Sequence, residues 1–309
     1  MPTITTTETT TKKITKPASL LSSGHRACAG CGQLLAAKTV INTVGKEAII
    51  ANATGCLEVT TTPLPESSWG VPWIHSLFEN PAAVATGVLA ALRTKGLDNK
   101  TKVIVQGGDG GMFDIGFGII SGAWERRENI LFITYDNEAY SNTGMQASGA
   151  TPIGSSTTTT PNGRHHKIGD IRPKKDMIAI ALAHGLNYVA QTTTGFIGDI
   201  EAKIKKALTI EGPTYIQILS PCIPGWRIKS DQAVSSGKLA AQTGLYPILE
   251  YVNGELTGKM KVPATTPKVD EYLKMQGRFG HLFKTPEGLE AIKQIQAQAD
   301  KNIAKYGLK

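Results

Sequence analysis

Short apolar runs rich in β-branched residues alternate with helix-length apolar patterns over most of this 309-residue chain. The candidate strands share this buried, β-branched character and cover residues 48–51, 102–106, 130–135 and 214–219. The candidate helices carry apolar residues at helical spacing and cover residues 34–44, 82–94, 112–127, 177–184 and 197–208. Strands that alternate with helices are typical of a parallel sheet with helices on both faces. The sequence therefore predicts an α/β fold.

Three parts of the chain differ in composition and pattern. Residues 1–24 are rich in Thr, Lys and Ser, which predicts a flexible or partner-bound tail. Residues 25–228 hold the alternating pattern and form the predicted main domain, interrupted by a long loop at 149–176 whose length is typical of lids or disordered segments. From 229 to 309 the pattern loosens and ends in a helix near 286–306, which predicts a C-terminal extension or interface arm.

The composition limits the classes of protein that fit. The chain has 33 Lys and Arg against 25 Asp and Glu, a net charge of +8, which suits either a solvated surface or an acidic partner such as a small electron carrier. Aromatic residues make up only 6% and are not interleaved with basic runs, so nucleic-acid binding is not expected. No apolar run approaches the roughly 20 residues of a membrane span, and residues 3–11 are too polar for a signal peptide. We expect a cytoplasmic protein.

A glycine-rich turn follows the candidate strand at 102–106 directly, as Gly-Gly-Asp-Gly-Gly at 107–111. Glycines permit close backbone approach, and the amides of a following helix attract phosphate. Asp109 then supplies an oxygen ligand for Mg²⁺, which usually keeps phosphate oxygens in its octahedron. Asn137 follows the next strand, and the carboxyl ends of adjacent parallel strands lie side by side. The pattern predicts a diphosphate site in which Asp109 and Asn137 share one ion.

Other uses of such a loop remain possible from the residues alone. A glycine turn between strand and helix can be structural only. The chain has no Gly-x-Gly-x-x-Gly fingerprint after a strand and no Gly-Lys-Ser/Thr loop, so dinucleotide and nucleoside triphosphate sites are disfavoured.

The four cysteines, Cys28, Cys31, Cys56 and Cys222, are a complete ligand set for an iron–sulfur cluster or a structural zinc. The Cys-x-x-Cys pair formed by Cys28 and Cys31 is, taken alone, typical of a zinc knuckle and also fits a thioredoxin-type redox pair. The other two cysteines are single and distant, which argues against a zinc ribbon or finger. Cys₄ coordination itself suits either metal. Four cysteines in a chain this long do not predict a disulfide framework.

Gly108-Asp109-Gly110 followed by Asn137 resembles the thiamine diphosphate motif. Together with the cysteines, it makes the chain similar to the β subunits of the 2-oxoacid:ferredoxin oxidoreductases, which include pyruvate:ferredoxin oxidoreductase. The similarity runs from about residue 24 to 250. The stretches that carry it are GHRACAGCG at 24–32, NATGCLE at 52–58, YSNTG at 140–144 and SPCIPGW at 220–226.

The resemblance implies a thiamine diphosphate-binding fold and assigns site residues within it. Magnesium ligands would be Asp109, Asn137 and the carbonyl of Ala139, and the four cysteines would hold a [4Fe–4S] cluster. Asn142 would also contact the thiazolium ring or the substrate, as the catalytic candidate of this chain. The residues that would contact the cofactor are Gly108, Asp109, Gly110, Gly111, Asn137, Asn142, Thr143 and, near the aminopyrimidine, Gln33.

The activity implied by the resemblance is oxidative decarboxylation of a 2-oxoacid to acyl-CoA and CO₂. Electrons would pass through the cluster to ferredoxin. Pyruvate is the favoured substrate, with oxalate, branched-chain and aromatic 2-oxoacids as alternatives. The glutamate that activates the aminopyrimidine is expected on another subunit, so α-, γ- and δ-type partners are required.

Two further hypotheses of other classes are kept. A non-redox thiamine lyase or carboligase would use the same loop but would leave the cysteines without a role. A zinc-stabilised, non-enzymatic assembly protein would use the cysteines and leave the loop without a cofactor.

Overall fold

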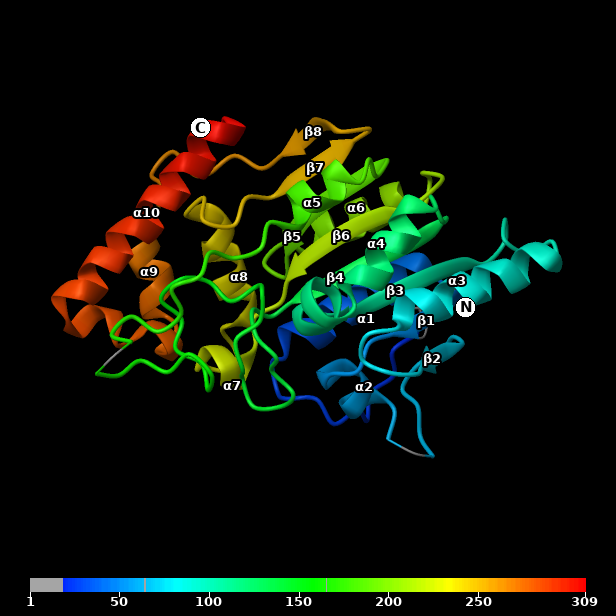
Figure 1. Cartoon of the computed structure of the whole chain (residues 1–309), viewed down its shortest axis with the longest axis horizontal. Helices are drawn as coiled ribbons and strands as arrows, with labels where there is room; N and C mark the ends of the chain where they lie inside the picture. The colour runs from blue at the N-terminus through cyan, green and yellow to red at the C-terminus, as the bar shows by residue number, and fades with distance from the viewer. Residues whose placement is uncertain (1–18, 64, 165) are drawn as a thin grey trace, which may run out of the picture.

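The computed structural model describes residues 19–63, 65–164 and 166–309 (Figure 1). Most of the predicted N-terminal tail, residues 1–18, therefore lies outside the described residues. Its described end is packed against the rest of the chain. Leu21 is buried and forms an antiparallel bridge with Trp69, and the Ser22 amide donates to the Ser68 carbonyl at 2.8 Å. Leu21 and Ser22 are therefore held by contacts within the chain, and the flexible or partner-bound tail stays a prediction for residues 1–18, outside the described residues.

The described strands form one eight-stranded sheet in the order β2-β1-β3-β4-β6-β5-β7-β8. In this spatial order, the first six strands, β2-β1-β3-β4-β6-β5, pair in parallel. The strands β7 and β8 are added antiparallel at one edge, which confirms the prediction of a mostly parallel sheet. The strands β2, β5 and β8 were not predicted. The bounds are β1 Ala48–Asn52, β2 Trp73–His75, β3 Lys102–Gly108, β4 Ile130–Asp136, β5 Tyr188–Thr193, β6 Thr214–Leu219, β7 Leu249–Val252 and β8 Glu255–Lys259.

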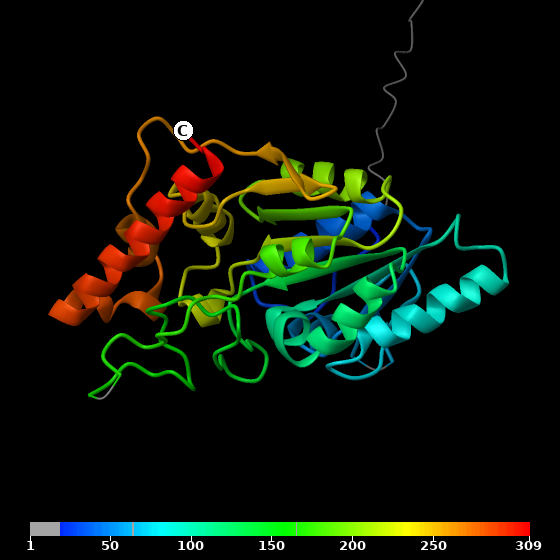
Figure 2. The same cartoon turned by 45° about the horizontal axis from the view of Figure 1, so that its top comes forward.

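Helices cover both faces of this sheet (Figure 2). The α-helices are α1 Gly32–Val44, α2 Cys56–Thr61, α3 Pro81–Thr94, α4 Phe117–Glu125, α5 Met177–Ala183, α6 Ile197–Ala207, α7 Ile223–Trp226, α8 Ala233–Gln242, α9 Val269–Lys274 and α10 Pro286–Tyr306. Three short helices of other types are η1 Gly110–Ile115, η2 Gly277–Phe279 and η3 Leu282–Lys284. None of the described helices is long and apolar enough to cross a lipid bilayer.

The strand side chains alternate between two cores, because successive residues of a strand point to opposite faces. In β3, Val103 and Val105 pack in the core under α3 and α4, whereas Ile104 packs in the core under α1 and α6. Central strands with apolar residues on both faces are typical of parallel sheets.

The helix predicted at 112–127 is interrupted, which corrects that prediction. The chain forms the π-helix η1 first, in which the Gly116 amide donates to the Gly111 carbonyl at 3.0 Å, and α4 begins only at Phe117. A Cβ atom at Gly116 would lie 2.4 Å from the Gly111 carbonyl oxygen and 2.9 Å from that of Glu79. The glycine permits this close approach, which periodicity in the sequence cannot report.

Residues after 228 share the main sheet through β7 and β8. They also build a third core in which Trp226, Phe279 and Leu282 pack with side chains of α8, α9 and α10. Figure 1 shows α9 and α10 together on the left, beyond the sheet.

The described part of residues 149–176 contains no helix or strand, as predicted, yet it is not an open lid. Ala150, Thr151 and Ser155 are buried, and the Ser156 amide donates to the Arg278 carbonyl at 3.0 Å. This loop is a packed connection to the C-terminal segment.

Candidate cofactor site

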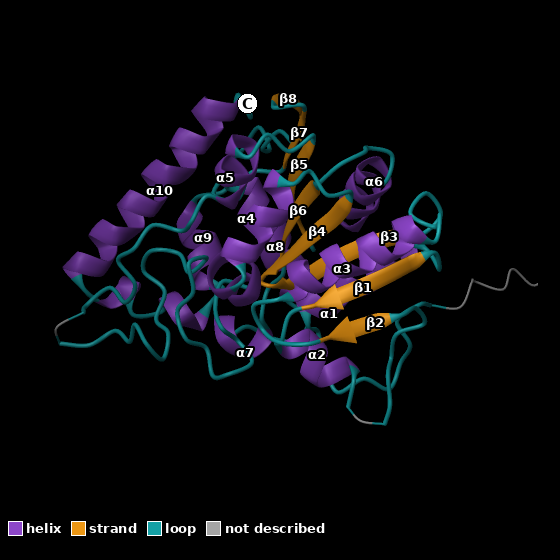
Figure 3. Ribbon diagram, turned by 45° about the vertical axis from the view of Figure 1, so that its right-hand side comes forward, coloured by secondary structure: helices purple, strands orange, loops and turns teal. Residues whose placement is uncertain are grey.

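A cavity of about 90 Å³ lies at the carboxyl ends of β1, β3 and β4. Figure 3 shows the arrowheads of the parallel strands on the side where the loops gather. The cavity brings together residues that the sequence analysis selected from distant segments: Gln33, Gly108, Gly110, Gly111, Asn137, Ala139, Asn142 and Thr143. The remaining wall is formed by Ala53, Thr54, Gly55, Cys56, Leu57, Phe78, Tyr140 and Ser141. An open α/β sheet binds its ligands in such a crevice.

Two glycines of the loop are needed for close packing at this cavity. A Cβ atom at Gly110 would lie 2.5 Å from the Tyr140 ring, and one at Gly111 would lie 2.9 Å from Ala53 Cβ. Both residues lie at the start of η1, directly after Asp109. Backbone amides at such a position are suited to phosphate oxygens.

Polar atoms of the three predicted magnesium ligands converge beside the cavity. The Asn137 side-chain atom that faces Ser141 lies 2.7 Å from the Ala139 carbonyl oxygen and 3.1 Å from Asp109 Oδ1. If this atom is the amide nitrogen, it donates to these oxygens. If it is Oδ1, three acceptors face one another, an arrangement that a cation stabilises. Neighbouring ligands of an octahedral Mg²⁺ with bonds of about 2.1 Å are about 3.0 Å apart, so these two separations are compatible with such an ion.

Asp109 is fully buried at the end of β3. Burial, and then the nearby charge of Asp136, raises the pKa of Asp109 to about 8, although the Ser148 hydroxyl and the Asn137 amide act in the opposite direction. The Asn137 amide donates to Asp109 Oδ1 at 3.1 Å, and the Ser148 hydroxyl donates to Oδ2. Burial disfavours the charged form of this carboxylate, and a bound cation would compensate its charge.

The cysteines lie on loops at the ends of three helices. Cys31 directly precedes α1, Cys56 is the first residue of α2, and Cys222 directly precedes α7. The segments of Cys31 and Cys222 are in close backbone contact, since a Cβ atom at Gly32 would lie 2.8 Å from backbone atoms of Pro221.

The thiols affect one another's protonation. Burial raises the pKa of Cys31 and Cys222, and that of Cys56 to about 12. The charge of Cys222 raises the pKa of both Cys31 and Cys56, and the charge of Cys28 raises all three, so the four predicted ligands are neighbours. Among the described residues, no three His, Cys, Asp or Glu side chains are placed to hold a single metal ion.

The cavity and the thiols adjoin. Cys56 lines the cavity, and Ser141 links the two regions. Its side chain lies 2.8 Å from the Asn137 side chain and also forms a hydrogen bond with Cys222, which offsets part of the rise in pKa that burial causes at that thiol.

Several residues of the site were not selected from the sequence. Ser148 contacts Asp109, Phe78 forms an apolar wall, and Trp226 donates from Nε1 to the Asn137 carbonyl at 2.9 Å. Trp226 lies within the SPCIPGW stretch, so its proximity to Cys222 was a usable signal. Phe78 and Ser148 lie in no motif.

The sequence matches the family described as thiamine pyrophosphate enzyme, C-terminal TPP binding domain, over residues 53–218. It is 50% identical to pyruvate synthase subunit PorB of Methanosarcina barkeri, covering 95% of this chain and 99% of the relative. It is 40% identical to ketoisovalerate oxidoreductase subunit VorB of Pyrococcus furiosus, covering 88% of each chain. Among solved structures, 2-oxoglutarate:ferredoxin oxidoreductase from Magnetococcus marinus is similar, with a TM-score of 0.53 and 26% identity over 65% of this chain and 68% of that chain.

Proposed function

Because this chain belongs to the β subunits of the 2-oxoacid:ferredoxin oxidoreductases, we propose that its assembly oxidatively decarboxylates pyruvate to acyl-CoA and CO₂. The observation that carries this proposal is the convergence of the glycine loop, Asn137 and Ala139 on one cavity that Cys56 also lines. That convergence supports a diphosphate cofactor and an electron acceptor side by side.

Thiamine diphosphate, when bound, supplies the carbon nucleophile and the electron sink for decarboxylation. In this proposal the start of η1 holds the diphosphate through backbone amides. Asp109, Asn137 and the Ala139 carbonyl hold Mg²⁺. Asn142 and Gln33 line the same cavity and orient the rings of the cofactor and the substrate.

Cys28, Cys31, Cys56 and Cys222 are proposed to hold a [4Fe–4S] cluster that passes electrons to ferredoxin. Cys31, Cys56 and Cys222 each lie close enough to other thiols for the charge of a neighbour to raise the pKa, and a metal centre that binds the thiolate forms would compensate this repulsion, which supports a shared centre. The cysteines discriminate against a non-redox lyase, which would have no use for them. The glycine-loop cavity discriminates against a zinc-stabilised assembly protein.

The choice of substrate rests on the relatives. The 50% identical relative is named a pyruvate synthase subunit, whereas the ketoisovalerate oxidoreductase subunit is 40% identical. A branched-chain 2-oxoacid is therefore the second candidate. The α-, γ- and δ-type partner subunits are proposed to supply the glutamate that activates the aminopyrimidine.

The test is anaerobic purification of the chain co-expressed with its partner subunits, followed by analysis for iron, sulfide, magnesium and thiamine diphosphate. We expect thiamine diphosphate and magnesium, and an iron and sulfide content that falls by about one cluster in the Cys56→Ser variant. CoA-dependent reduction of ferredoxin should be faster with pyruvate than with 2-oxoisovalerate. Zinc without sulfide, and no thiamine diphosphate, would overturn the proposal.

A further inference from the structure

The residue between two of the proposed magnesium ligands has an unusual backbone. Glu138 lies between Asn137 and Ala139 and has φ +66°. This is the left-handed region of backbone conformation, which residues other than glycine rarely adopt. Asn137 and Ala139 line the cofactor cavity, whereas Glu138 lines a separate cavity of about 330 Å³. The turn thus directs two residues toward the cofactor and the third away from it.

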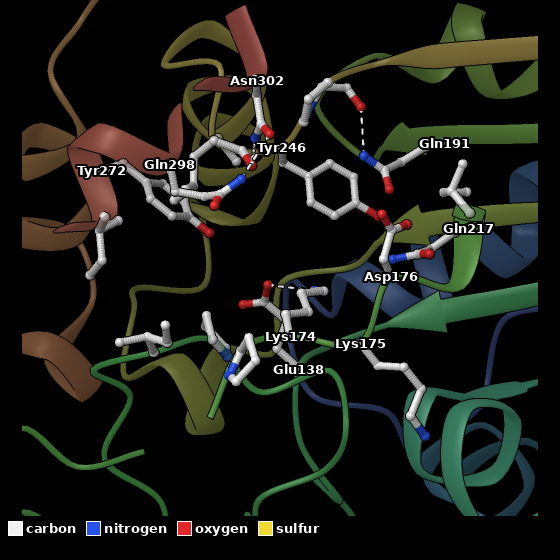
Figure 4. A pocket seen from close by; sticks show the side chains of 18 of the residues that line it. Glu138, Lys174, Lys175, Asp176, Gln191, Gln217, Tyr246, Tyr272, Gln298 and Asn302 are labelled. Carbon is white, nitrogen blue, oxygen red and sulfur yellow. Dashed lines mark hydrogen bonds and ion pairs between the residues drawn. The ribbon is translucent and has the colours of Figure 1, made fainter. Parts of the chain in front are cut away.

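Two cations from distant segments bind the Glu138 carboxylate. Lys174 Nζ lies 2.7 Å from Glu138 Oε1 and 2.6 Å from Asp136 Oδ2, so one ammonium group contacts residues on both sides of Asn137. Arg278 Nη2 donates to Glu138 Oε2, and the side chains of this pair are only 3% and 6% exposed. Figure 4 shows Glu138 and Lys174 joined on one side of the larger cavity, with Asn302 across it.

Backbone contacts fix the same turn. Trp226 Nε1 donates to the Asn137 carbonyl at 2.9 Å, and Thr151 Oγ1 donates to the Glu138 carbonyl at 2.8 Å. The Arg278 guanidinium lies over the Trp226 ring, 4.1 Å from its centroid, and its Nε donates to Gln276 at 2.9 Å. One arginine of the C-terminal segment therefore supports both the Glu138 side chain and the indole that binds Asn137.

We propose that Glu138, Lys174 and Arg278 act as positioning residues, an ionic clamp that holds Asn137 and Ala139 in the geometry that binds magnesium. The C-terminal segment, through Arg278, would thereby complete the diphosphate site, although its own residues lie outside the cofactor cavity. This inference rests on the proposed magnesium ligands. Buried ion pairs are weak evidence for stability in general, so the test must separate metal affinity from folding.

The test uses the co-expressed complex, with Mn²⁺ in the presence of thiamine diphosphate as the probe and electron paramagnetic resonance to measure free Mn²⁺. Glu138→Gln keeps the size of the side chain and removes its charge. Residues that orient metal ligands typically contribute 10–100-fold to metal affinity. We expect the Kd for Mn²⁺ to rise at least about 10-fold in Glu138→Gln and Arg278→Gln, and less in Arg278→Lys, which restores the positive charge.

Asp199→Asn is the matched control. It breaks another ion pair, between Asp199 and Lys203, whose side chain is 6% exposed. Both residues lie on α6, and no residue of α6 lines the cofactor cavity. It should leave the Kd for Mn²⁺ within about twofold of the wild-type value. If the folded Glu138→Gln and Arg278→Gln variants also bind Mn²⁺ with a Kd within about twofold of the wild-type value, the clamp is overturned.

Asp109→Asn separates this failure from failure of the proposed function. If Asp109→Asn abolishes Mn²⁺ binding and Glu138→Gln does not change it, the clamp alone is wrong. If Asp109→Asn also leaves binding unchanged, the assignment of the metal site is wrong. Should Glu138→Gln fail to assemble, Arg278→Gln gives the same comparison, because it breaks the same ion pair from the other side.

Discussion

The indole of Trp226 donates a 2.9 Å hydrogen bond to the backbone carbonyl of Asn137, a residue 89 positions away in the sequence. Trp226 ends the short helix that follows Cys222, and Asn137 lies beside the cofactor cavity. The bond ties the loop of a proposed cluster ligand to the loop of a proposed magnesium ligand. The separation between the two proposed centres is thereby fixed by direct contact.

Trp226→Phe tests the importance of this bond. The buried Asn137 carbonyl would lose its indole donor, at a cost of about 1–3 kcal/mol of stability. We expect a lower unfolding temperature and a weaker affinity for Mn²⁺ with thiamine diphosphate. Trp124→Phe is the control, because the buried Trp124 Nε1 has no hydrogen-bond partner in the described structure. The control should lose stability through packing without a change in Mn²⁺ affinity.

Gly110→Ala tests the close packing of the loop. The added Cβ atom would lie 2.5 Å from the Tyr140 ring, so that ring, which lines the cavity, must move. We expect at least about 10-fold weaker retention of thiamine diphosphate, measured after desalting, since geometry at such sites is tightly constrained. Gly118→Ala, in the exposed part of α4, meets no atom within 4 Å and should stabilise the protein by about 0.5–1 kcal/mol. Equal retention in the two variants would contradict the role of the loop.

Asp109→Asn should stabilise the metal-free protein at pH 8. The pKa of Asp109 is raised to about 8 by burial, whereas that of an unfolded Asp is about 3.9, so the native state retains the proton over this range. The stability of the metal-free wild-type protein therefore falls as pH rises from about 4 to 8, and the neutral amide removes this loss.

Thermal unfolding in EDTA at pH 5.5 and pH 8 measures the effect. We expect a gain of about 1–2 kcal/mol in Asp109→Asn at pH 8 and a smaller gain at pH 5.5. A variant that is less stable than the wild type at pH 8 would show that the Asp109 carboxylate is already compensated within the protein.

The thiols of the metal-free protein should react with iodoacetamide at different rates. Cys28 is exposed, whereas burial raises the pKa of Cys56 to about 12, which leaves almost no thiolate at neutral pH. Mass spectrometry should show modification of Cys28 first and Cys56 much later. Reconstitution with iron and sulfide should protect all four thiols. Cys56 labelled as fast as Cys28 would contradict the environment described for it.

Much of the site could be predicted because its chemistry is local in the sequence. Gly107–Gly111 follows a strand directly, and the strand before Asn137 is strongly apolar, so parallel pairing alone placed Asp109 beside Asn137. The alternation of strands and helices likewise predicted the class of fold. The roles assigned to the cysteines and to Ala139 came from resemblance and stay predictions until metal analysis tests them.

Tertiary structure decided the features that depend on contacts between distant segments. The strand β5 was missed because its last residues, Gln191–Thr193, are polar. They are in the sheet because they pair with Gln217–Leu219 of β6. The π-helix η1 ends at Gly116, where the absence of a Cβ atom permits close approach to the carbonyl of Glu79, a residue of a distant segment. Arg278 reaches Glu138 across 140 positions. Local patterns determine which segments become strands, helices and phosphate loops, whereas the packing of remote segments determines which buried charges meet.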